Sequence, residues 1–527
     1  MGSKDAEVMK EGIIMKKLMT LALAAAMMLG AATGANAIDF KAKGQWIMSF
    51  DYGMHGNFGE SKAKNNSGFK NEDEFEARQR VRLQLDAVAS EALSGTVFFE
   101  IGDQVWGDND NGGALGADGK VVELKRAYID WMVPQTDLKV RMGIQGIALP
   151  SFTTNASQIM DDDVAAISLN YQFNENVGLT AFWARPYNDN AGYYKNGDFR
   201  KGSQFDNYMD NMDMFAVLLP LTFDGVKVTP WVMYAAMGPG MFDSKYNDAK
   251  AEWTMSSFGN AWGRAGAGMV SGFGGSDKWT NYGNAFWAGV TGEVTLWDPF
   301  RIAWDVNYGS AAYDDQKMNR EGWLASLLLE YKRDWGTPGL YGWYSTGDDN
   351  NPRNGSERMP VVSANGNNDF SNFAFNGNPY IAREGILGST MVGTWGIGAR
   401  LKDVSFLEDL KHTLRVNFMG GTNAPKMAKY VRNDGEDLQK RGTYSFAEYG
   451  LGYDPMYLTT EDYALEIGLT NTYKMYDNFT VMLDAAYVAL WLDDSTSTWG
   501  KNPGRSALGG DGVYDAWNVN LSFVYSF

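Results

Sequence analysis

The 527-residue sequence contains no cysteine and only two histidines, His55 and His412. Without cysteine the chain cannot form a disulfide, a thiolate metal site or a cysteine nucleophile. Two histidines with no obvious Ser–Asp partnership also leave little room for histidine metal sites or catalytic triads. We therefore expect a protein that is not an enzyme and that binds neither a metal nor a cofactor.

Long apolar runs are also missing beyond the N-terminal leader. The longest are 214–223 and 485–492, whereas a membrane-spanning helix needs about 20 apolar residues. A helical membrane protein is therefore not expected. Acidic residues outnumber basic ones by 64 to 46, and the net charge is −18. A chain this acidic is a poor partner for nucleic acid.

The first 37 residues have the pattern of a secretory leader. Lys16 and Lys17 precede an apolar stretch at 18–29, and small residues follow up to Ala35-Asn36-Ala37. A positive segment, a short apolar stretch and an A-x-A site are typical of a cleaved signal peptide. We expect residues 1–37 to be removed near Ala37, and residues 38–527 to form a single domain.

The sequence does contain many short segments in which apolar and polar residues alternate. The last of these, 517–527, reads WNVNLSFVYSF and places its aromatic and aliphatic residues on one face. Strand side chains alternate between two faces, so one face of this segment is apolar and the other polar. The segment also has the ~9–11 residues that a tilted strand needs to cross a bilayer. This pattern indicates a membrane-spanning barrel strand that ends on Phe527.

Eighteen such segments can be counted, with sixteen as the alternative because 212–221 and 322–332 alternate poorly. Brief turns and long polar loops alternate between them, as in outer-membrane barrels with short periplasmic turns and long extracellular loops. The predicted fold is therefore all-β, a transmembrane antiparallel β-barrel. A secreted soluble β-sandwich protein is the alternative, which the loop asymmetry disfavours. The segments are 46–52, 75–88, 93–102, 122–132, 137–146, 164–173, 177–185, 212–221, 226–236, 286–296, 301–312, 322–332, 339–347, 392–402, 412–420, 462–474, 479–491 and 517–527.

The number of strands itself predicts a function. In lipid every backbone N–H and C=O has to be paired, and a closed barrel achieves this without a free edge. With roughly sixteen to eighteen strands the lumen is too wide for side chains to fill. Polar residues on the inner face then require water. We therefore expect a water-filled channel for the passive diffusion of small hydrophilic solutes and ions.

Arginines gather on the inner face of neighbouring strands. In 75–88 the apolar Val81 and Leu83 would face lipid, so the arginines that alternate with them would face the lumen. The same alternation in 122–132 and 137–146 turns further basic residues inward. The expected basic wall consists of Arg78, Arg80, Arg82, Arg126 and Arg141.

The loop at 146–163 ends in three acids, Asp161, Asp162 and Asp163. If this loop folds inward, its acids face the basic wall, and the field between them would select solutes by charge. Alternatively, the arginines pair with acids of their own wall and the aspartates form a solvated loop tip. The acids available for such pairing are Glu76, Asp86, Glu100 and Asp130.

Four features of the chain resemble the outer-membrane homotrimeric porins of sulfate-reducing bacteria. They are the signal peptide, the segments 125–131 (KRAYIDW) and 141–146 (RMGIQG), and the terminal Phe527. The general trimeric porins are similar more distantly. In those porins the third loop carries acids and the facing wall carries arginines, which Asp161–Asp163 and the Arg78–Arg82 ladder match only by position in the topology.

The resemblance implies a homotrimer in the outer membrane of a Gram-negative bacterium, in contact with membrane lipid and lipopolysaccharide. It also implies that Phe527 is read by the barrel-assembly machinery. Two other functions stay open at this point. A substrate-specific channel, for sugars for example, would need a track of aromatic residues in the lumen, and Tyr128, Tyr341 and Trp343 are candidates. A structural surface protein would leave the polar inner face unexplained.

Overall fold

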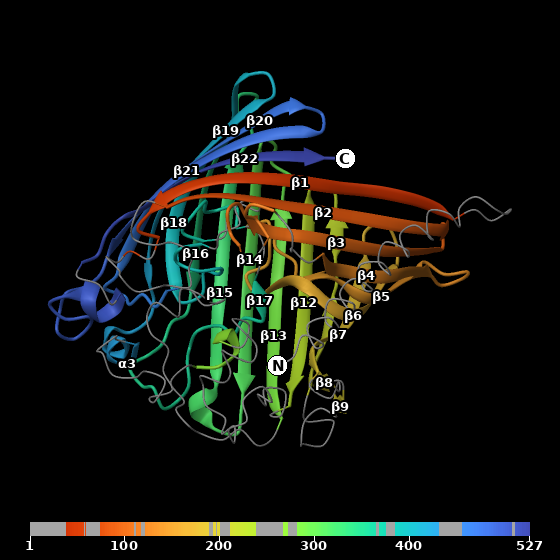
Figure 1. Ribbon diagram of the computed structural model, residues 1–527. Coiled ribbons are helices and arrows are strands. Elements are labelled where there is room, and N and C mark those ends of the chain that lie inside the picture. The colour runs from red at the N-terminus through yellow and green to blue at the C-terminus, as the bar shows by residue number, and fades with distance from the viewer. Residues whose placement is uncertain are drawn as a thin grey trace, which may run out of the picture.

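The computed structural model describes residues 38–56, 58, 74–109, 112–116, 122–188, 193–195, 198–200, 211–238, 267–271, 282–364, 368–375, 385–431, 456–508 and 512–527. The predicted leader, 1–37, lies outside the described residues. Almost all of the described chain is β-strand or the connections between strands, and it forms one large antiparallel sheet (Figure 1).

The wall of the molecule is a closed barrel of eighteen described strands, which confirms the predicted count. Each strand pairs with its neighbours in chain order, and β1 pairs with β22 to close the cylinder. β10 and β11 form one wall strand that is interrupted at Leu219 and Pro220. The wall strands are β1 (Asp39–Met54), β2 (Glu74–Ser90), β3 (Leu93–Val105), β4 (Glu123–Met132), β5 (Leu138–Ala148), β6 (Met160–Gln172), β7 (Gly178–Asn188), β10 (Asn211–Leu218) with β11 (Leu221–Phe223), β12 (Val226–Met237), β13 (Gly283–Val294), β14 (Phe300–Ala312), β15 (Arg320–Tyr331), β16 (Thr337–Ser345), β18 (Thr394–Leu407), β19 (Leu410–Gly421), β20 (Tyr463–Tyr476), β21 (Phe479–Trp491) and β22 (Ala516–Ser526).

The remaining elements are short and belong to the connections on the long-loop side. β8 (Tyr193–Lys195) and β9 (Asp198–Arg200) pair with each other, and β17 (Ser363–Ala364) pairs in parallel with the start of β6. The helical turns are η4 (Ala267–Met269), η5 (Gln316–Met318), η6 (Pro425–Met427), α3 (Ala428–Val431) and η7 (Gly504–Leu508). Within the described chain, none of the helices combines the length and the apolar character that crossing a membrane requires.

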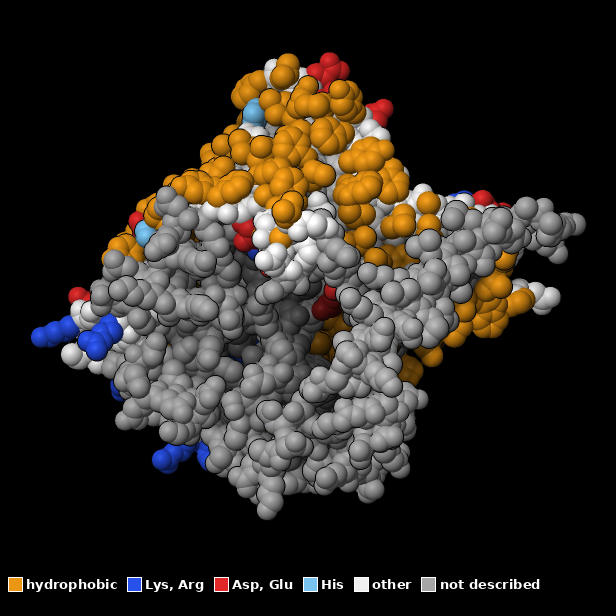
Figure 2. All heavy atoms as spheres, viewed as in Figure 1, with side chains coloured by type: hydrophobic (Ala, Val, Ile, Leu, Met, Phe, Trp, Pro, Cys, Tyr) orange, Lys and Arg blue, Asp and Glu red, His pale blue; other side chains and the backbone are white. Residues whose placement is uncertain are grey.

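The side chains of the wall alternate between an apolar outer face and a more polar inner face. In β1, Trp46 and Tyr52 are exposed on the outside, whereas Ser49 and Asp51 are buried inside. Figure 2 shows the outer face over β19 to β22 covered by apolar side chains. In a soluble protein an exposed apolar surface of this extent would be costly to hydrate. It is the surface expected of a wall in contact with hydrocarbon.

The seam between the first and last strands is sealed by the terminal residue. The backbone N–H of Gly44 donates to the Phe527 carbonyl at 2.8 Å, and the Phe527 N–H donates to the Gly44 carbonyl at 3.0 Å. On the inner side of the seam, the Asn520 amide donates to the Ser49 hydroxyl at 2.6 Å and the Asn518 amide to Asp51 at 2.7 Å. The polar face predicted for 517–527 therefore points inward and is hydrogen-bonded.

Connections from the long-loop side fold back into the barrel. The segments 149–159, 356–364, 368–375 and 385–393 are largely buried, and their apolar residues join the inward side chains of β7, β10, β12 and β13 in one apolar cluster. Part of the lumen is therefore filled by protein. Polar inner walls lie on either side of this filled part.

Candidate functional site

The predicted basic wall lies on the inner face of the barrel. Arg78 and Arg80 are in register with Ser49 and Ile47 of β1, whose side chains point inward. Arg82 continues the ladder opposite Gln45. Arg141 of β5 is in register with Asp130 of β4. The alternation of the sequence therefore placed these side chains correctly.

The basic side chains of this wall are paired with acids of the same wall. The Arg82 guanidinium donates to Glu100 at 2.6 Å, and Arg141 donates to both oxygens of Asp130 at 2.6 and 2.8 Å. Arg78 forms an ion pair with Glu76. Of the alternatives that the sequence left open, pairing within the wall is the one observed for these arginines.

Asp86 differs from the other acids predicted to pair with the arginines. It accepts hydrogen bonds from the Thr96 hydroxyl at 2.7 Å and from the Gln84 amide at 2.8 Å. Tyr128 also belongs to this wall, and its ring lies 4.0 Å from the guanidinium carbon of Arg141. The wall therefore presents alternating charges and one aromatic ring to the lumen.

The prediction for Asp161–Asp163 was wrong about their position. These residues are not in a loop but form the start of β6, in register with Ala148, Ile147 and Gly146 of β5. Successive residues of a strand point to opposite faces, so three consecutive acids cannot all face the basic wall.

The contacts of these acids follow from the strand geometry. Asp162 is in register with the buried Ile147 and accepts a hydrogen bond from the Ser363 hydroxyl of β17 at 2.6 Å. Asp163 accepts from Arg126 at 2.5 Å and lies 3.2 Å from the Lys125 ammonium. Arg126 of β4 thus pairs with an acid of β6, two strands along the same wall.

The loop before these acids does fold inward, but it is held by a residue that the sequence did not single out. Asp305 of β14 accepts hydrogen bonds from the Ser151 hydroxyl at 2.8 Å and from the backbone N–H groups of Phe152 and Thr153 at 2.9 and 3.1 Å. The Phe152 carbonyl accepts from Arg301 at 2.8 Å. The 149–159 loop connects β5 and β6 and is therefore fixed to β14, on another part of the barrel wall.

A second set of inward charges runs along β12 to β15 near the short turns. The Lys227 ammonium donates to Glu293 at 2.8 Å, and Arg301 joins Glu293 at 2.7 Å to Glu330 at 2.8 Å. Glu293 thus lies between two basic groups on the adjacent strands β12 and β14. Glu330 connects this row to the next cluster.

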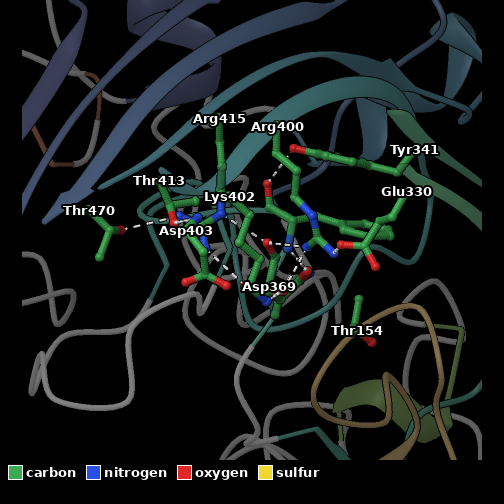
Figure 3. A network of polar contacts seen from close by, with 12 residues as sticks. Thr154, Glu330, Tyr341, Asp369, Arg400, Lys402, Asp403, Thr413, Arg415 and Thr470 are labelled. Carbon is green, nitrogen blue, oxygen red and sulfur yellow. Dashed lines mark hydrogen bonds and ion pairs between the residues drawn. The ribbon is translucent and has the colours of Figure 1, made fainter. Parts of the chain in front are cut away.

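Arg400 of β18 continues the row through Asp369, which belongs to the inserted 368–375 segment (Figure 3). Arg400 donates to Glu330 at 2.7 Å and to Asp369 at 2.6 Å, while Lys402 and Arg415 each reach Asp369 at 2.9 Å. Burial alone would raise the pKa of Asp369, but the positive charges of Arg400, Lys402 and Arg415 lower it to about 2.

The 368–375 segment is locked onto the C-terminal wall by one carboxylate. Glu466 of β20 accepts from the backbone N–H groups of Asn372 at 2.9 Å, Phe373 at 2.7 Å and Ala374 at 3.2 Å. The Ser371 hydroxyl adds a bond at 3.0 Å. Three backbone donors on one buried carboxylate fix the segment in position without any regular secondary structure.

The aromatic residues considered for a sugar track are covered by this segment. The Phe370 ring stacks on Tyr341 with centroids 4.1 Å apart, and Tyr341 and Trp343 are both buried. Trp343 also lies against Gly396 of β18, where a Cβ would come within 2.2 Å of its ring. These two candidate rings therefore pack the interior and do not line an open path in the described part of the chain.

The two polar walls differ in their contact with solvent. On the N-terminal wall the side chains of Arg82, Arg141 and Lys139 are 28%, 29% and 41% exposed. On the C-terminal wall Arg400 and Arg415 are only 2% and 8% exposed. Water can therefore reach the charges of β2–β5, whereas Arg400 and Arg415 are sealed beneath the inserted segment. Lys402, in the same cluster, keeps 33% of its side chain exposed.

Among the described residues, no group of three or more His, Asp and Glu side chains is arranged to hold a metal ion. His412 lies on the outer face near the short turns, and its Nδ1 is 2.6 Å from the Asn471 amide oxygen. His55 stacks on Tyr514, with ring centroids 5.0 Å apart. Neither histidine faces the charged walls.

No protein-family model and no curated protein matches the sequence. Solved structures with a similar arrangement include OpdQ of Pseudomonas aeruginosa (9% identity, TM-score 0.47, covering 93% of this chain and 98% of that one). Others are OprD of the same organism (10%, 0.46, 92% and 95%) and OccAB4 of Acinetobacter baumannii (10%, 0.46, 94% and 100%). These TM-scores are below 0.5, so the similarity carries no argument about what this chain does. The predicted resemblance to porins of sulfate-reducing bacteria stays a prediction.

Proposed function

We propose that this protein is an outer-membrane channel through which small hydrophilic solutes and ions diffuse passively. The observation that carries the proposal is the half-exposed row of charges on the inner face of β2–β5, inside a closed barrel with an apolar exterior. Charged side chains that are partly exposed inside such a barrel need water beside them. A water-filled path along this wall meets that need.

The outer surface supports a position in a membrane. Trp131, Trp297 and Trp491 lie at or near the ends of wall strands, where amphipathic rings favour the level of the lipid headgroups. The secretory leader and the loop asymmetry favour the outer membrane of a Gram-negative bacterium. A homotrimer, contact with lipopolysaccharide and recognition of Phe527 by the assembly machinery are further parts of the proposal, which rest on the family resemblance.

The charges of the open wall set the local potential along the path. Basic and acidic groups alternate within hydrogen-bond distance, so the field is strong near the wall and falls off within a Debye length of about 8–10 Å. A polar or charged solute loses hydrogen bonds with water when it approaches this wall, but it regains them with the side chains of the wall. An apolar solute makes no such bonds, so polar and charged solutes are favoured. Discrimination by size would come from the inserted loops, which narrow the lumen.

Reconstitution of the purified protein into planar bilayers tests the proposal directly. We expect a steady conductance that rises in proportion to salt concentration, and uptake of neutral sugars that falls with their size. Saturation and block by one sugar or one anion would favour the substrate-specific channel instead. A folded, inserted barrel that conducts no ions would contradict both.

A further inference from the structure

The outer face of the barrel has a groove where a convex surface would be expected. It has a volume of about 810 Å³ and is lined by β14, β15, β16, β18 and β19 near the short turns. Ile302, Leu329, Leu340, Ala399 and Val416 form one row across these five strands, because they are neighbours in register on the outer face. All five side chains of this row are apolar.

The shape of the groove follows from residue size. Pro338 and Ala399 lie in the middle strands, between the larger Phe300 and Tyr331 on one side and Leu414 on the other. Small side chains between large ones leave a depression on the surface. The depression opens toward the short-turn rim, where Trp297 and Trp335 are exposed.

The rim above the groove carries four exposed charges from two adjoining turns. Lys332 and Arg333 follow β15, Asp334 comes next, and Asp298 lies in the turn before β14. The two turns are in contact, since the Lys332 N–H donates to the Pro299 carbonyl at 2.9 Å. Within the described part of the chain these four side chains make no ion pair, and the Arg333 guanidinium lies 4.2 Å from the centre of the Tyr331 ring.

From this arrangement we infer that the groove binds one zwitterionic diacyl phospholipid of the leaflet at the short-turn rim, such as phosphatidylethanolamine. An acyl chain fills the apolar groove and supplies the van der Waals contacts that an unfilled depression would lack. The phosphodiester binds Arg333, because guanidinium and phosphate form strong charge-assisted hydrogen bonds. The ammonium group meets Asp298 or Asp334. The inference rests on the proposed membrane position of the barrel.

The balance of charge favours this occupant over others. Two positive and two negative side chains on the rim match a headgroup that carries one charge of each sign, whereas an anionic headgroup would also meet the two aspartates. A second copy of this chain would have to leave the four rim charges at the edge of an apolar interface without partners, which is costly.

The test measures retained lipid by native mass spectrometry after purification in detergent and incubation with phosphatidylethanolamine. We expect one bound phospholipid per chain, and none when a diacylglycerol with the same chains replaces it. Arg333→Glu removes the phosphate contact, and Ala399→Phe fills the groove. Each is expected to weaken retention by at least about tenfold, the effect of losing one charge-assisted hydrogen bond.

Matched control variants separate the groove from the rest of the surface. Ala485→Phe changes a small outward residue of β21, and Lys474→Glu reverses a charge of β20 close to another short turn. Both controls should retain lipid as the parent does. Equal retention by all four variants, equal binding of diacylglycerol, or a stable dimer in place of lipid would overturn the inference. Conductance of the same samples tests the channel separately, because a conducting barrel without bound lipid contradicts only the lipid site.

Discussion

At the scale of single residues, the inner face is governed by whether each charge has a partner and whether water reaches it. Arg82 and Arg400 are both paired with acids, yet only Arg82 is exposed to water inside the barrel. An acidic partner forms hydrogen bonds with the guanidinium but does not cancel its electric field in a partly exposed site, where screening by salt is incomplete. Charges of the open wall should therefore affect ion selectivity, whereas charges of the sealed wall should affect stability.

On the open wall, the variant Arg80→Ala plus Arg82→Ala is expected to shift ion selectivity toward cations. The change removes two positive charges and leaves Glu100 beside Lys125, 3.9 Å away. We expect the permeability ratio of cation to anion to rise roughly twofold or more at low salt, and less at high salt, because salt screens the wall. Reversal potentials under a salt gradient measure this ratio. Lys474→Ala, in β20 close to a short turn, is the control. An unchanged ratio in the double variant would mean that this ladder does not govern permeation.

On the sealed wall, Asp369→Asn is expected to destabilise the barrel. It leaves Arg400, Lys402 and Arg415 with one acid fewer in a buried site, which costs about 3–5 kcal/mol. Thermal unfolding in detergent at pH 7 should therefore begin at a lower temperature than in the parent.

The pH dependence of the parent has a definite sign. The carboxyl of Asp369 titrates near 3.8 in the unfolded chain and at about 2 in the folded protein. A lowered folded pKa contributes stability that is complete above the unfolded pKa and is lost as the pH falls through the folded value. The stability difference between parent and Asp369→Asn should thus be constant above about pH 5 and shrink toward pH 2. A difference that grows on acidification would contradict this assignment.

At the scale of elements, the strands could be predicted and the inserted segments could not. Alternation predicts the faces of β1, β2 and β22 because every second residue must be apolar against lipid. The 368–375 segment has no such period, and its position depends on Glu466, whose role appears only when β20 is placed beside it. The loop predicted for Asp161–Asp163 was wrong for a related reason. A run of polar residues resembles a loop in the sequence even where it pairs with a neighbouring strand, here β5. A charged residue at an inward position of a well-alternating strand, such as Arg301 or Arg400, was the signal that could have indicated the second wall.

The inserted segment itself can be released by one substitution. Glu466→Gln keeps the size of the side chain but exchanges a carboxylate that accepts three backbone N–H groups for a neutral amide. We expect the segment to lose its fixed position, because hydrogen bonds to a charged acceptor are roughly twice as strong as neutral ones.

The chain has no natural cysteine, so a single introduced cysteine reports access cleanly. Asn417, which lies beneath the segment and donates to the Phe370 carbonyl at 2.7 Å, is the reporter position. Asn417→Cys should react slowly with a water-soluble maleimide, and at least about tenfold faster once Glu466→Gln is added, if release exposes the wall. Lys139→Cys on the open wall should react rapidly with and without Glu466→Gln. Rapid labelling of Asn417→Cys in the parent background would contradict the division into an open and a sealed wall.

At the scale of the whole molecule, the fold depends on closing the cylinder, because an open edge in lipid would leave a row of unpaired backbone groups. Closure joins residues from the two ends of the chain, and the last of them, Phe527, bonds to Gly44 through both of its backbone groups. Its ring also packs on this strand, and a Cβ at position 44 would lie 2.4 Å from it. The terminal aromatic therefore has a structural role at the seam in addition to the proposed role as an assembly signal.

Two variants distinguish these roles. Gly44→Val leaves Phe527 intact but forces its ring away from the seam, so it should lower the unfolding temperature of barrels that still reach the membrane. Phe527→Ser removes the ring. If the ring is also an assembly signal, this variant should give a lower yield of inserted barrels, whatever the stability of those that do insert. One assay measures the amount of heat-modifiable barrel in membranes, and the other measures the unfolding temperature of the barrel. Phe527→Tyr keeps an aromatic ring and should behave as the parent in both. If Phe527→Ser assembles in normal yield but unfolds at a lower temperature, the ring acts at the seam alone. The variant barrel would then reach the membrane normally, and only the stability of its closed wall would be reduced.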